Sequence, residues 1–441
     1  MKTPVDSATG TQPAPLTRRR FLGAAVAAAA APYVIPSHVL AGTPPSERYG
    51  IGVIGVGGRG GDHLRTCLGR PDCQVLAVCD PQQGKRDGAK KLAQDTYAHK
   101  SGAGTYSGCS AYSDFRELLA QPGIDAIFIA SPENWHALHT IHSVRAGKDV
   151  YCEKAMTLSH AEGLAVIENV RRYGRVVQIG MQQRSWGIFR QACELVRNQY
   201  IGKLHTIYVS VPGGQALGNA PSKPVPPGLD YEMWLGPAPY TPYNDLKCSF
   251  NWYFMHDYCI GWISSWGIHY LDVAQWGAPS LCTQPLEVEG TATFPTDGIA
   301  NDSYKWKVNI DTADGIHTIY TDDSQGRHGV KFIADKGWVF VNRGGISAEP
   351  ASLLKVKLKP EEEHLYEAYD HHQCFFDCVR SRKDPSAPVE VGHSGNVLAI
   401  VSDAATRLQR KVRWDWAAQQ FLKDEEANRM LSRPMRPPWT L

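Results

Sequence analysis

Short apolar runs alternate with longer segments of mixed polarity between residues 49 and 154. The apolar runs are rich in Val, Ile and Ala and have the length of buried strands: residues 51–54, 75–80, 125–130 and 149–152. The segments with helical spacing between them are residues 84–94, 115–120 and 135–146. This alternation is typical of βαβ units, so we predict an open parallel sheet with ligand groups at the carboxyl ends of its strands.

Past residue 174 the pattern changes, because strand-like runs follow one another with fewer helices between them. These runs are residues 176–180, 205–211, 287–292, 306–311 and 317–321. They predict a second domain on a mixed or largely antiparallel sheet. Two helices are expected near the end of the chain, at residues 369–382 and 397–408.

Two segments lack a regular pattern. Residues 212–242 are rich in proline and glycine, and connections of this length in compact domains are usually functional covers or arms. Residues 416–441 form a tail that ends in a run of Arg, Pro and Trp. The tail is either an arm that reaches another chain or a frayed end, and the sequence favours neither.

Residues 1–41 have the features of a targeting segment. Residues 17–22 match the twin-arginine export pattern, an alanine-rich apolar stretch follows at 23–31, and the small residues before position 42 suit cleavage after Ala41. The apolar stretch is about half as long as a membrane span. We therefore predict export through the twin-arginine machinery to the periplasm or beyond. An uncleaved membrane tether or a disordered extension is the alternative.

The formal charge of +2 comes from this leader. Residues 1–41 carry four basic residues and one acid, whereas the remainder has 42 basic and 43 acidic residues. A nearly neutral body argues against a nucleic-acid or anionic-membrane surface, and favours small-molecule chemistry.

The cysteines and histidines do not form a metal motif. There are 11 cysteines, and Cys374 and Cys378 lack the C-x-x-C spacing of redox or zinc sites. The histidines at 256, 269, 371 and 372 show no known ligand spacing either. We expect buried free thiols and no metal.

A G-x-G-x-x-G hexamer at residues 55–60 directly follows the first predicted strand and opens a helix. Glycines let the backbone approach a pyrophosphate, and a helix N-terminus supplies amide donors. Asp80, 20 residues past Gly60, ends the second strand and suits a ribose diol. A merely structural turn is the alternative. The predicted nucleotide-binding residues here are Gly55, Gly57, Gly58, Arg59, Gly60 and Asp80. The charge of Asp80 favours NAD over NADP, although Lys85 and Arg86 leave NADP open.

Four stretches come in an order that suggests a family: residues 55–60, 131–136 (SPENWH), 146–154 (AGKDVYCEK) and 267–272 (GIHYLD). With these, the chain resembles the Gfo/Idh/MocA oxidoreductases, which include glucose-fructose oxidoreductase and inositol dehydrogenase. The resemblance implies an α/β fold with a dinucleotide-binding Rossmann domain, here residues 48–170. It also implies a substrate and oligomerisation domain on a mixed, largely antiparallel open sheet, here residues 171–415.

The resemblance also implies a Glu-Lys-Pro motif whose lysine lies beside the nicotinamide. Here it reads Glu153-Lys154-Ala155, so the proline is missing. Lys154 is the first candidate for a catalytic residue, because a lysine beside a cationic ring can relay a proton to or from a substrate hydroxyl. The alternative is a surface lysine after a strand.

A second implied element is an Asp-x-x-x-His pair on one helix face. The histidine is His269, but Ser265 stands at the aspartate position. Either Asp272 or Asp257 replaces the missing acid, or the proton chemistry depends on Lys154 and His269 alone. A core histidine beneath neighbouring tryptophans is the alternative for His269.

Other residues are assigned only by their matching positions. The further cofactor candidates are Ser131, Pro132, Asn134, His136, Glu153 and Gln182. The further substrate candidates are Arg184, Asp257, Ser265 and His372. Ordinary polar surface roles remain open for each of them.

These observations predict an exported NAD-dependent oxidoreductase that acts on a hydroxyl of a sugar, glycoside or cyclitol. The cofactor should be tightly held, because the twin-arginine route carries folded proteins. One alternative is an NAD-dependent glycoside hydrolase that works by oxidation, elimination, water addition and re-reduction. Another is a non-catalytic sugar-binding protein that retains a dinucleotide. A homo-oligomer through the second sheet is expected from the resemblance.

Overall fold

The predicted parallel sheet is present in the computed structural model, which describes residues 47–102 and 104–441. The leader predicted at residues 1–41 lies outside the described residues. The first sheet has six parallel strands in the order β3-β2-β1-β4-β5-β6. Its strands are β1 (Tyr49–Ile54), β2 (Cys73–Cys79), β3 (Ser110–Tyr112), β4 (Ala126–Ile129), β5 (Asp149–Cys152) and β6 (Val177–Ile179).

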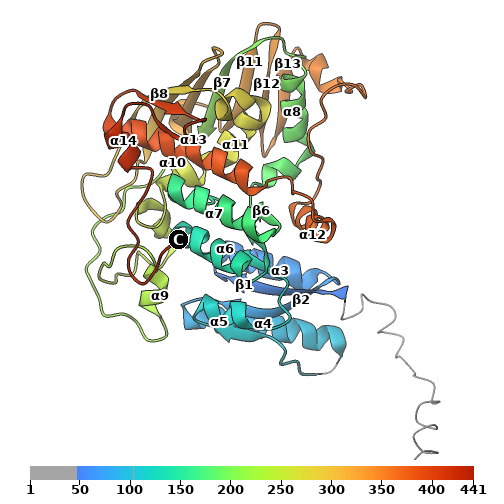
Figure 1. The fold of residues 1–441 in the computed structure, drawn as a ribbon, viewed down its shortest axis with the longest axis vertical. Helices are drawn as coiled ribbons and strands as arrows, with labels where there is room; N and C mark the ends of the chain where they lie inside the picture. Colours follow the sequence, from blue (N-terminus) through green and yellow to red (C-terminus); the bar gives the residue numbers. More distant parts are fainter. Residues whose placement is uncertain (1–46, 103) are drawn as a thin grey trace, which may run out of the picture. The chain divides into compact units, whose positions relative to one another are not determined.

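Helices cover both faces of this sheet (Figure 1). One face packs on α3 (Gly58–Gly69), α4 (Gln83–Ser101) and α12 (His371–Ser381). The other packs on α5 (Phe115–Ala120), α6 (His136–Arg145) and α7 (His160–Tyr173). Because both faces are buried, the strands are apolar throughout instead of alternating, which explains why short apolar runs marked them in the sequence.

The first sheet continues past residue 170, where the sequence placed the end of the first domain. β6 pairs with β5 in parallel, with Val150 opposite Val177. The run at residues 176–180 was assigned to the second domain because the alternation of strands and helices becomes weaker after residue 174. It is instead the last strand of the first sheet, and α7 makes the connection to it.

The second sheet has nine strands in the order β13-β12-β11-β7-β10-β9-β8-β14-β15. Neighbouring strands are antiparallel except for β7 and β10, so the predicted mixed, largely antiparallel sheet is confirmed. The strands are β7 (Leu204–Val211), β8 (Leu286–Thr293), β9 (Lys305–Thr312), β10 (His317–Asp322), β11 (Gly329–Ala334), β12 (Gly337–Asn342), β13 (Gly345–Glu349), β14 (Val412–Asp415) and β15 (Gln420–Phe421).

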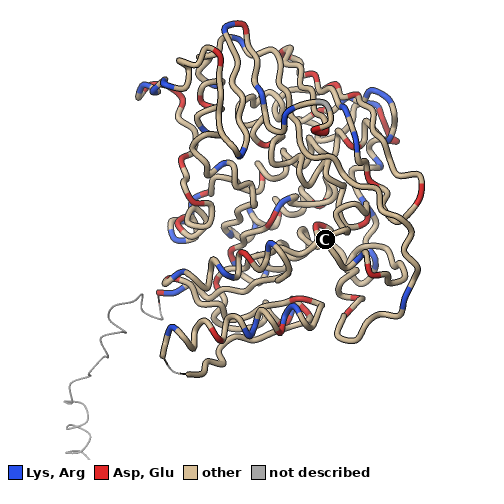
Figure 2. The backbone as a smooth tube through the Cα atoms, turned by 180° about the vertical axis from the view of Figure 1, so that it is seen from behind, with Lys and Arg blue, Asp and Glu red and all other residues tan. Residues whose placement is uncertain are grey.

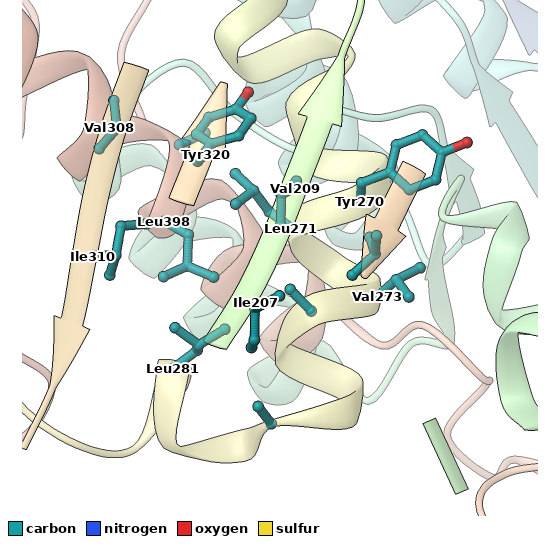
Figure 3. Close-up of a cluster of buried hydrophobic side chains, with 14 of the residues drawn as sticks. Ile207, Val209, Tyr270, Leu271, Val273, Leu281, Val308, Ile310, Tyr320 and Leu398 are labelled. Carbon is teal, nitrogen blue, oxygen red and sulfur yellow. The ribbon is translucent and has the colours of Figure 1, made fainter. Parts of the chain in front are cut away.

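One face of the second sheet packs against α8 (Gly187–Arg197), α11 (Gly267–Gly277) and α13 (Val389–Leu408). Figure 3 shows Ile207 and Val209 of β7 and Val308 and Ile310 of β9 with side chains of α11 and with Leu398 of α13. Along β9 every second residue is buried, whereas Lys305 and Lys307 point to the other face and are exposed. The second sheet therefore has one covered face and one open face.

Tertiary packing sets helix ends that the sequence pattern missed. α13 begins at Val389 and not at residue 397, although its first turns contain two glycines. A Cβ at Gly392 would lie 2.7 Å from Ile179 Cγ1, so this glycine lets the helix approach β6 closely. α4 runs on to Ser101 through a polar stretch and ends where Gly102 adopts a left-handed conformation.

The proline- and glycine-rich stretch belongs to a long segment, residues 212–260, which we call the arm. It contains α9 (Tyr231–Leu235) and the short 3-10 helix η4 (Phe250–Phe254). The arm is fastened to the first domain by backbone hydrogen bonds, from Asp230 N to Pro81 O (3.0 Å) and from Asn134 N to Tyr258 O (3.1 Å). The arm thus lies across the carboxyl ends of the first sheet.

The tail at residues 416–441 takes neither of the two forms expected for it, because it packs on its own chain. It contains β15 and α14 (Glu425–Arg429), and its end lies beside α6 (Figure 1). Trp439 is buried with its ring centroid 4.7 Å from that of Trp135. Arg433 pairs with Glu162 at 2.7 Å. The tail thereby stabilises the first domain through packing and an ion pair.

Two surface properties follow from the described residues. Basic and acidic residues are interspersed over both domains (Figure 2). No helix in the described part of the chain is long and apolar enough to span a membrane.

Candidate active site

A cavity of about 800 Å³ lies where the carboxyl ends of the first sheet face the arm, α11 and the β12–β13 hairpin. Most of the residues predicted for cofactor and substrate line it: Gly55, Gly57, Gly58, Arg59, Asp80, Ser131, Pro132, His136, Glu153, Lys154, Gln182, Ser265 and His269. The strand ends β1, β2, β4 and β5 therefore converge on one site, as the topology of an open α/β sheet dictates.

The glycine turn is shaped by two close backbone approaches. Gly55 has φ +78°, and a Cβ there would lie 2.6 Å from Ser131 N. A Cβ on Gly60 would lie 1.7 Å from Gly55 O, so Gly60 packs α3 against the turn and does not line the cavity. Gly58 has open space, and no side chain caps α3. The first amides of α3 are thus available to a phosphate.

Asp80 is buried at the end of β2 beside this turn. Its carboxylate accepts hydrogen bonds from Val56 N (3.1 Å) and Gln82 N (2.9 Å). Burial raises its pKa, and these amides and the nearby Lys85 oppose the rise. Lys85 also lines the cavity, whereas Arg86 donates to the carbonyls of Asp80 and Pro81. A carboxylate, a glycine turn and an uncapped helix in one elongated cavity fit a dinucleotide.

Glu153 is buried at the end of β5 and is held by two partners. Its Oε1 accepts from Arg59 Nε at 2.9 Å and lies 2.9 Å from His63 Nε2. Burial alone would raise the pKa of Glu153, but His63, Arg59 and Lys154 hold it well below its usual value. His63 Nδ1 in turn lies 2.8 Å from His372 Nε2 of α12. Glu153 is therefore a fixed carboxylate that connects three elements.

Lys154 extends from β5 across the cavity to α10 (Gly261–Ser265). Its Nζ donates to the carbonyl oxygen and to the hydroxyl oxygen of Ser265, both at 2.9 Å. The Tyr253 ring of η4 lies beside it, with its centroid 5.7 Å from Nζ. Ser265 thus orients the lysine, and the lysine still lines the cavity.

His269 lines the same end of the cavity and is neutral. Burial, then the nearby Lys154 and Arg343, lower its pKa well below the usual value. Its Nδ1 is buried and has no hydrogen-bond partner in the described part of the chain. Neither proposed substitute replaces the missing aspartate, because Asp272 is paired with Arg184 at 2.8 Å and Asp257 does not line the cavity.

In contrast to His269, His136 favours the protonated, positively charged form. Its Nδ1 lies 2.7 Å from Ala155 O and its Nε2 lies 2.9 Å from Ser131 O, so both ring nitrogens face acceptors. Burial opposes a charge on this ring, but the neighbouring Cys152, Glu133 and Ala155 carbonyl raise its pKa to about 9. When the ring is protonated, both of its N–H groups donate, so His136 links the SPENWH turn to the segment after β5.

Several predicted residues are not brought to the cavity. Asn134 donates to Leu235 O at 3.0 Å and so anchors the arm. Arg184 is buried against Asp272. His372 lies behind Glu153, on the far side of His63. These side chains are fixed by partners from distant segments, which their positions along the chain do not disclose.

The aromatic wall of the cavity and one arginine were not predicted from the sequence. The wall consists of Phe250, Trp252 and Tyr253 of the arm with Trp262 and Trp266 of the α10 region. The aromatic run at residues 250–254, close behind a segment already expected to be a cover, was an available signal. Arg343 of the β12–β13 hairpin carried no such signal.

The described residues contain no group of three or more His, Cys, Asp or Glu side chains arranged to hold a metal ion. All the cysteines are free thiols, and most of them are buried.

Two glycines of α3 give a matched pair of substitutions. We expect Gly60→Ala to weaken NAD binding at least about tenfold, because its Cβ would collide with Gly55 O and displace the turn. Gly69→Ala, at the other end of α3 and outside the cavity, adds the same methyl group into open space and should retain binding. Calorimetric titration with NAD, with circular dichroism to confirm folding, measures both. Equal affinities for the two variants would contradict this reading of the turn.

The raised pKa of His136 predicts a pH-dependent contribution to stability. The folded pKa of about 9 lies above the ordinary value of 6.5, so the contribution is complete below pH 6.5 and is lost as the pH rises through about 9. His136→Gln should cost about 1–3 kcal/mol of unfolding free energy at pH 6 and less at pH 9.5. Denaturant titrations at both pH values measure the difference. His205→Gln, exposed on β7, should change stability by less than about 0.5 kcal/mol at both.

Comparison with known proteins connects this site to a family. Residues 49–181 match the family model described as "Oxidoreductase family, NAD-binding Rossmann fold". Residues 213–441 match the model described as "Oxidoreductase family, C-terminal alpha/beta domain". The residues that form the glycine turn, Asp80 and the Glu153–Lys154 pair thus fall in an NAD-binding Rossmann domain.

Curated relatives are dehydrogenases that match in part. Over 182 residues the chain is 29% identical to myo-inositol 2-dehydrogenase of Thermotoga maritima, covering 41% of this chain and 47% of that protein. Over 159 residues it is 31% identical to inositol 2-dehydrogenase/D-chiro-inositol 3-dehydrogenase of Shouchella clausii, covering 35% and 41%. The chain spans less than half the length of the curated relatives that it matches.

Solved structures share the fold over most of the chain. Aldose-aldose oxidoreductase from Caulobacter crescentus, complexed with glycerol, superposes with a TM-score of 0.59 at 17% identity, covering 83% of this chain and 99% of that one. Scyllo-inositol dehydrogenase from Lactobacillus casei, with bound NAD(H) and scyllo-inositol, superposes with a TM-score of 0.56 at 17% identity and the same coverage. The two family models match residues 49–181 and 213–441, which is most of the chain, and the chain belongs to the Gfo/Idh/MocA oxidoreductase family.

Proposed function

We propose that this protein is an exported, NAD-dependent oxidoreductase that acts on a hydroxyl group of a sugar, glycoside or cyclitol. The observation that carries the proposal is that Lys154 and His269 line the same cavity as the glycine turn and Asp80. The names of the relatives, which are inositol dehydrogenases, support a polyhydroxylated substrate.

The chain offers a complete set of groups for the cofactor. The uncapped first turn of α3 with Gly57 and Gly58 would hold the pyrophosphate, and Asp80 would hold the adenosine ribose. When bound, NAD supplies a nicotinamide ring that accepts hydride from a carbon bearing a hydroxyl. Asp80 favours NAD because a second negative charge at this position would be repelled.

Lys154 is the group that would handle the proton. A neutral amine has two N–H groups and one lone pair. Since the two Ser265 oxygens can accept both N–H groups, the lone pair is free to take the proton of a substrate hydroxyl. Ser265 accepts these bonds without placing a negative charge beside the amine, which an aspartate at this position would do.

His269 would orient the substrate. Its neutral ring lines the cavity and can hydrogen-bond a sugar hydroxyl without adding charge. The unpartnered Nδ1 shows that no residue fixes the ring as an aspartate partner would. The proton chemistry therefore depends on Lys154, with His269 as a hydrogen-bonding partner of the substrate.

Export, cofactor retention and oligomerisation belong to the same proposal. The twin-arginine pattern at residues 17–22 supports export of the folded protein with NAD already bound. The open face of the second sheet, where Tyr208 is 43% exposed on β7, supports a homo-oligomer through that sheet.

A test of retention uses the protein as purified. Mass spectrometry of ligands released by denaturation should find NAD in near-stoichiometric amount. Gly60→Ala, prepared in parallel, should release much less, because its turn is displaced. Recovery of NADP as the main ligand would contradict the role given to Asp80. A protein that releases no dinucleotide would contradict tight retention.

The catalytic assignment is tested by Lys154→Ala. Reduction of bound NAD by a panel of cyclitols and aldoses, followed by nicotinamide absorbance, should become about 10²–10⁴-fold slower. Bound NAD should be unchanged. Lys91→Ala, an exposed lysine on α4, is the control and should leave the rate unaltered. A Lys154→Ala protein with the wild-type rate would exclude Lys154 as the proton acceptor.

Two other functions are compatible with a retained cofactor. An NAD-dependent glycoside hydrolase would oxidise, eliminate, add water and re-reduce, and the SPENWH turn that lines the cavity resembles the corresponding stretch of such enzymes. A non-catalytic sugar-binding protein would keep NAD as a structural group. Incubation with nitrophenyl glycosides and no added cofactor separates them. Nitrophenol release supports the hydrolase, bound-cofactor reduction alone supports the oxidoreductase, and neither supports a binding protein.

A further inference from the structure

The region of the cavity around Lys154 and Arg343 carries basic side chains. We call it the substrate end and define it by Lys154, Tyr253, Trp266, His269 and Arg343. The described part of the chain places no carboxylate within ion-pair distance of Lys154 or Arg343. Arg343 therefore faces this end without an ion-pair partner in the described part of the chain.

The two carboxylates that line the cavity, Asp80 and Glu153, already have hydrogen-bond partners. Asp80 lies at the other end, where its oxygens accept from Val56 N and Gln82 N. Glu153 is paired with Arg59 and His63. Glu133 is buried and does not line the cavity. Its Oε1 accepts from Ala155 N at 3.2 Å, and its Oε2 has no hydrogen-bond partner in the described part of the chain. None of them forms an ion pair with Arg343.

Ser265 removes the one negative charge that the resemblance would place here. In its position an aspartate would pair with Lys154, but the serine hydroxyl only accepts a hydrogen bond from it. His269 is neutral, as described above. The substrate end therefore lacks negative charge because of this chain's own residues.

Arg343 is placed to contact a ligand. It is exposed on the β12–β13 hairpin and lines the cavity, with its Cζ 5.0 Å from the centroid of the Trp266 ring. Trp266 also contacts His269, at 5.7 Å between ring centroids. Stacking on Trp266 orients the guanidinium plane and leaves its N–H edge for a planar anion.

We propose that the substrate is an acidic carbohydrate whose carboxylate binds Arg343, with the sugar ring against the aromatic wall. This inference rests on the proposed function and specifies its substrate class. A carboxylate matches one guanidinium in a bidentate pair. A phosphate ester is the competing anion, and glucose 6-phosphate is included in the experiment for this reason. A neutral sugar would leave Arg343 without an anionic partner.

The experiment compares matched ligands on the protein with its bound NAD. Affinities of D-glucuronate and D-galacturonate are measured by calorimetry against D-glucose and D-galactose. At least one uronate should bind at least tenfold more tightly than its neutral counterpart. Arg343→Gln should abolish that preference and change neutral-sugar affinity less than about threefold. Arg327→Gln is the control, because Arg327 is an exposed arginine stacked on Phe340 outside the cavity.

Four results would overturn the proposal: equal binding of every uronate and its neutral counterpart, equal losses for both ligand types in Arg343→Gln, loss of bound NAD in that variant, or stronger binding of glucose 6-phosphate. The proposed function is tested by different measurements, because it depends on the retention of NAD and on the slower reduction of NAD in Lys154→Ala. A uronate preference without NAD reduction would leave an acidic-sugar site and remove the oxidoreductase assignment.

Discussion

The buried carboxylate of Glu153 is the constraint on which the site depends. Arg59 reaches it from the first turn of α3, and His63 reaches it one turn later. His372 of α12 lies behind His63, so a helix from the second half of the sequence supports the first domain. An unpaired carboxylate at this depth would be costly, which keeps all four residues in place. The glycine turn and the end of β5 are thereby held in a fixed position relative to each other.

Lys154 follows directly in the chain, so the same constraint positions its side chain. Its amine crosses to Ser265 of α10, and that contact joins the two domains at the point of the proposed chemistry. The loss of the family's aspartate here frees His269 from a charged partner and gives the lysine an uncharged one. One substitution thus changes the charge of the whole substrate end.

The arm and the tail complete the cavity from outside the two sheets. The arm is fastened through Asn134 and carries Phe250, Trp252 and Tyr253 of the aromatic wall. The tail adds Arg433, which pairs with Glu162 and donates to Asn134 O at 3.0 Å. Residues about 300 positions apart in sequence therefore share one small network, and the wall depends on both segments.

Patterns within short stretches of sequence were enough to predict the elements whose residues are contiguous in the chain. Apolar runs disclosed the parallel strands because both faces of that sheet are buried, and the glycine hexamer with Asp80 disclosed the nucleotide end because strand, turn and helix are contiguous. Lys154 and His269 were found only through family motifs. The sequence could not place Arg184, Asn134 or His372, since each is held by a partner from a distant segment. It could not bring the aromatic wall and Arg343 to the cavity, because their approach depends on how the arm and the second sheet pack. Contiguous residues determined the cofactor end, and long-range packing alone decided the substrate end.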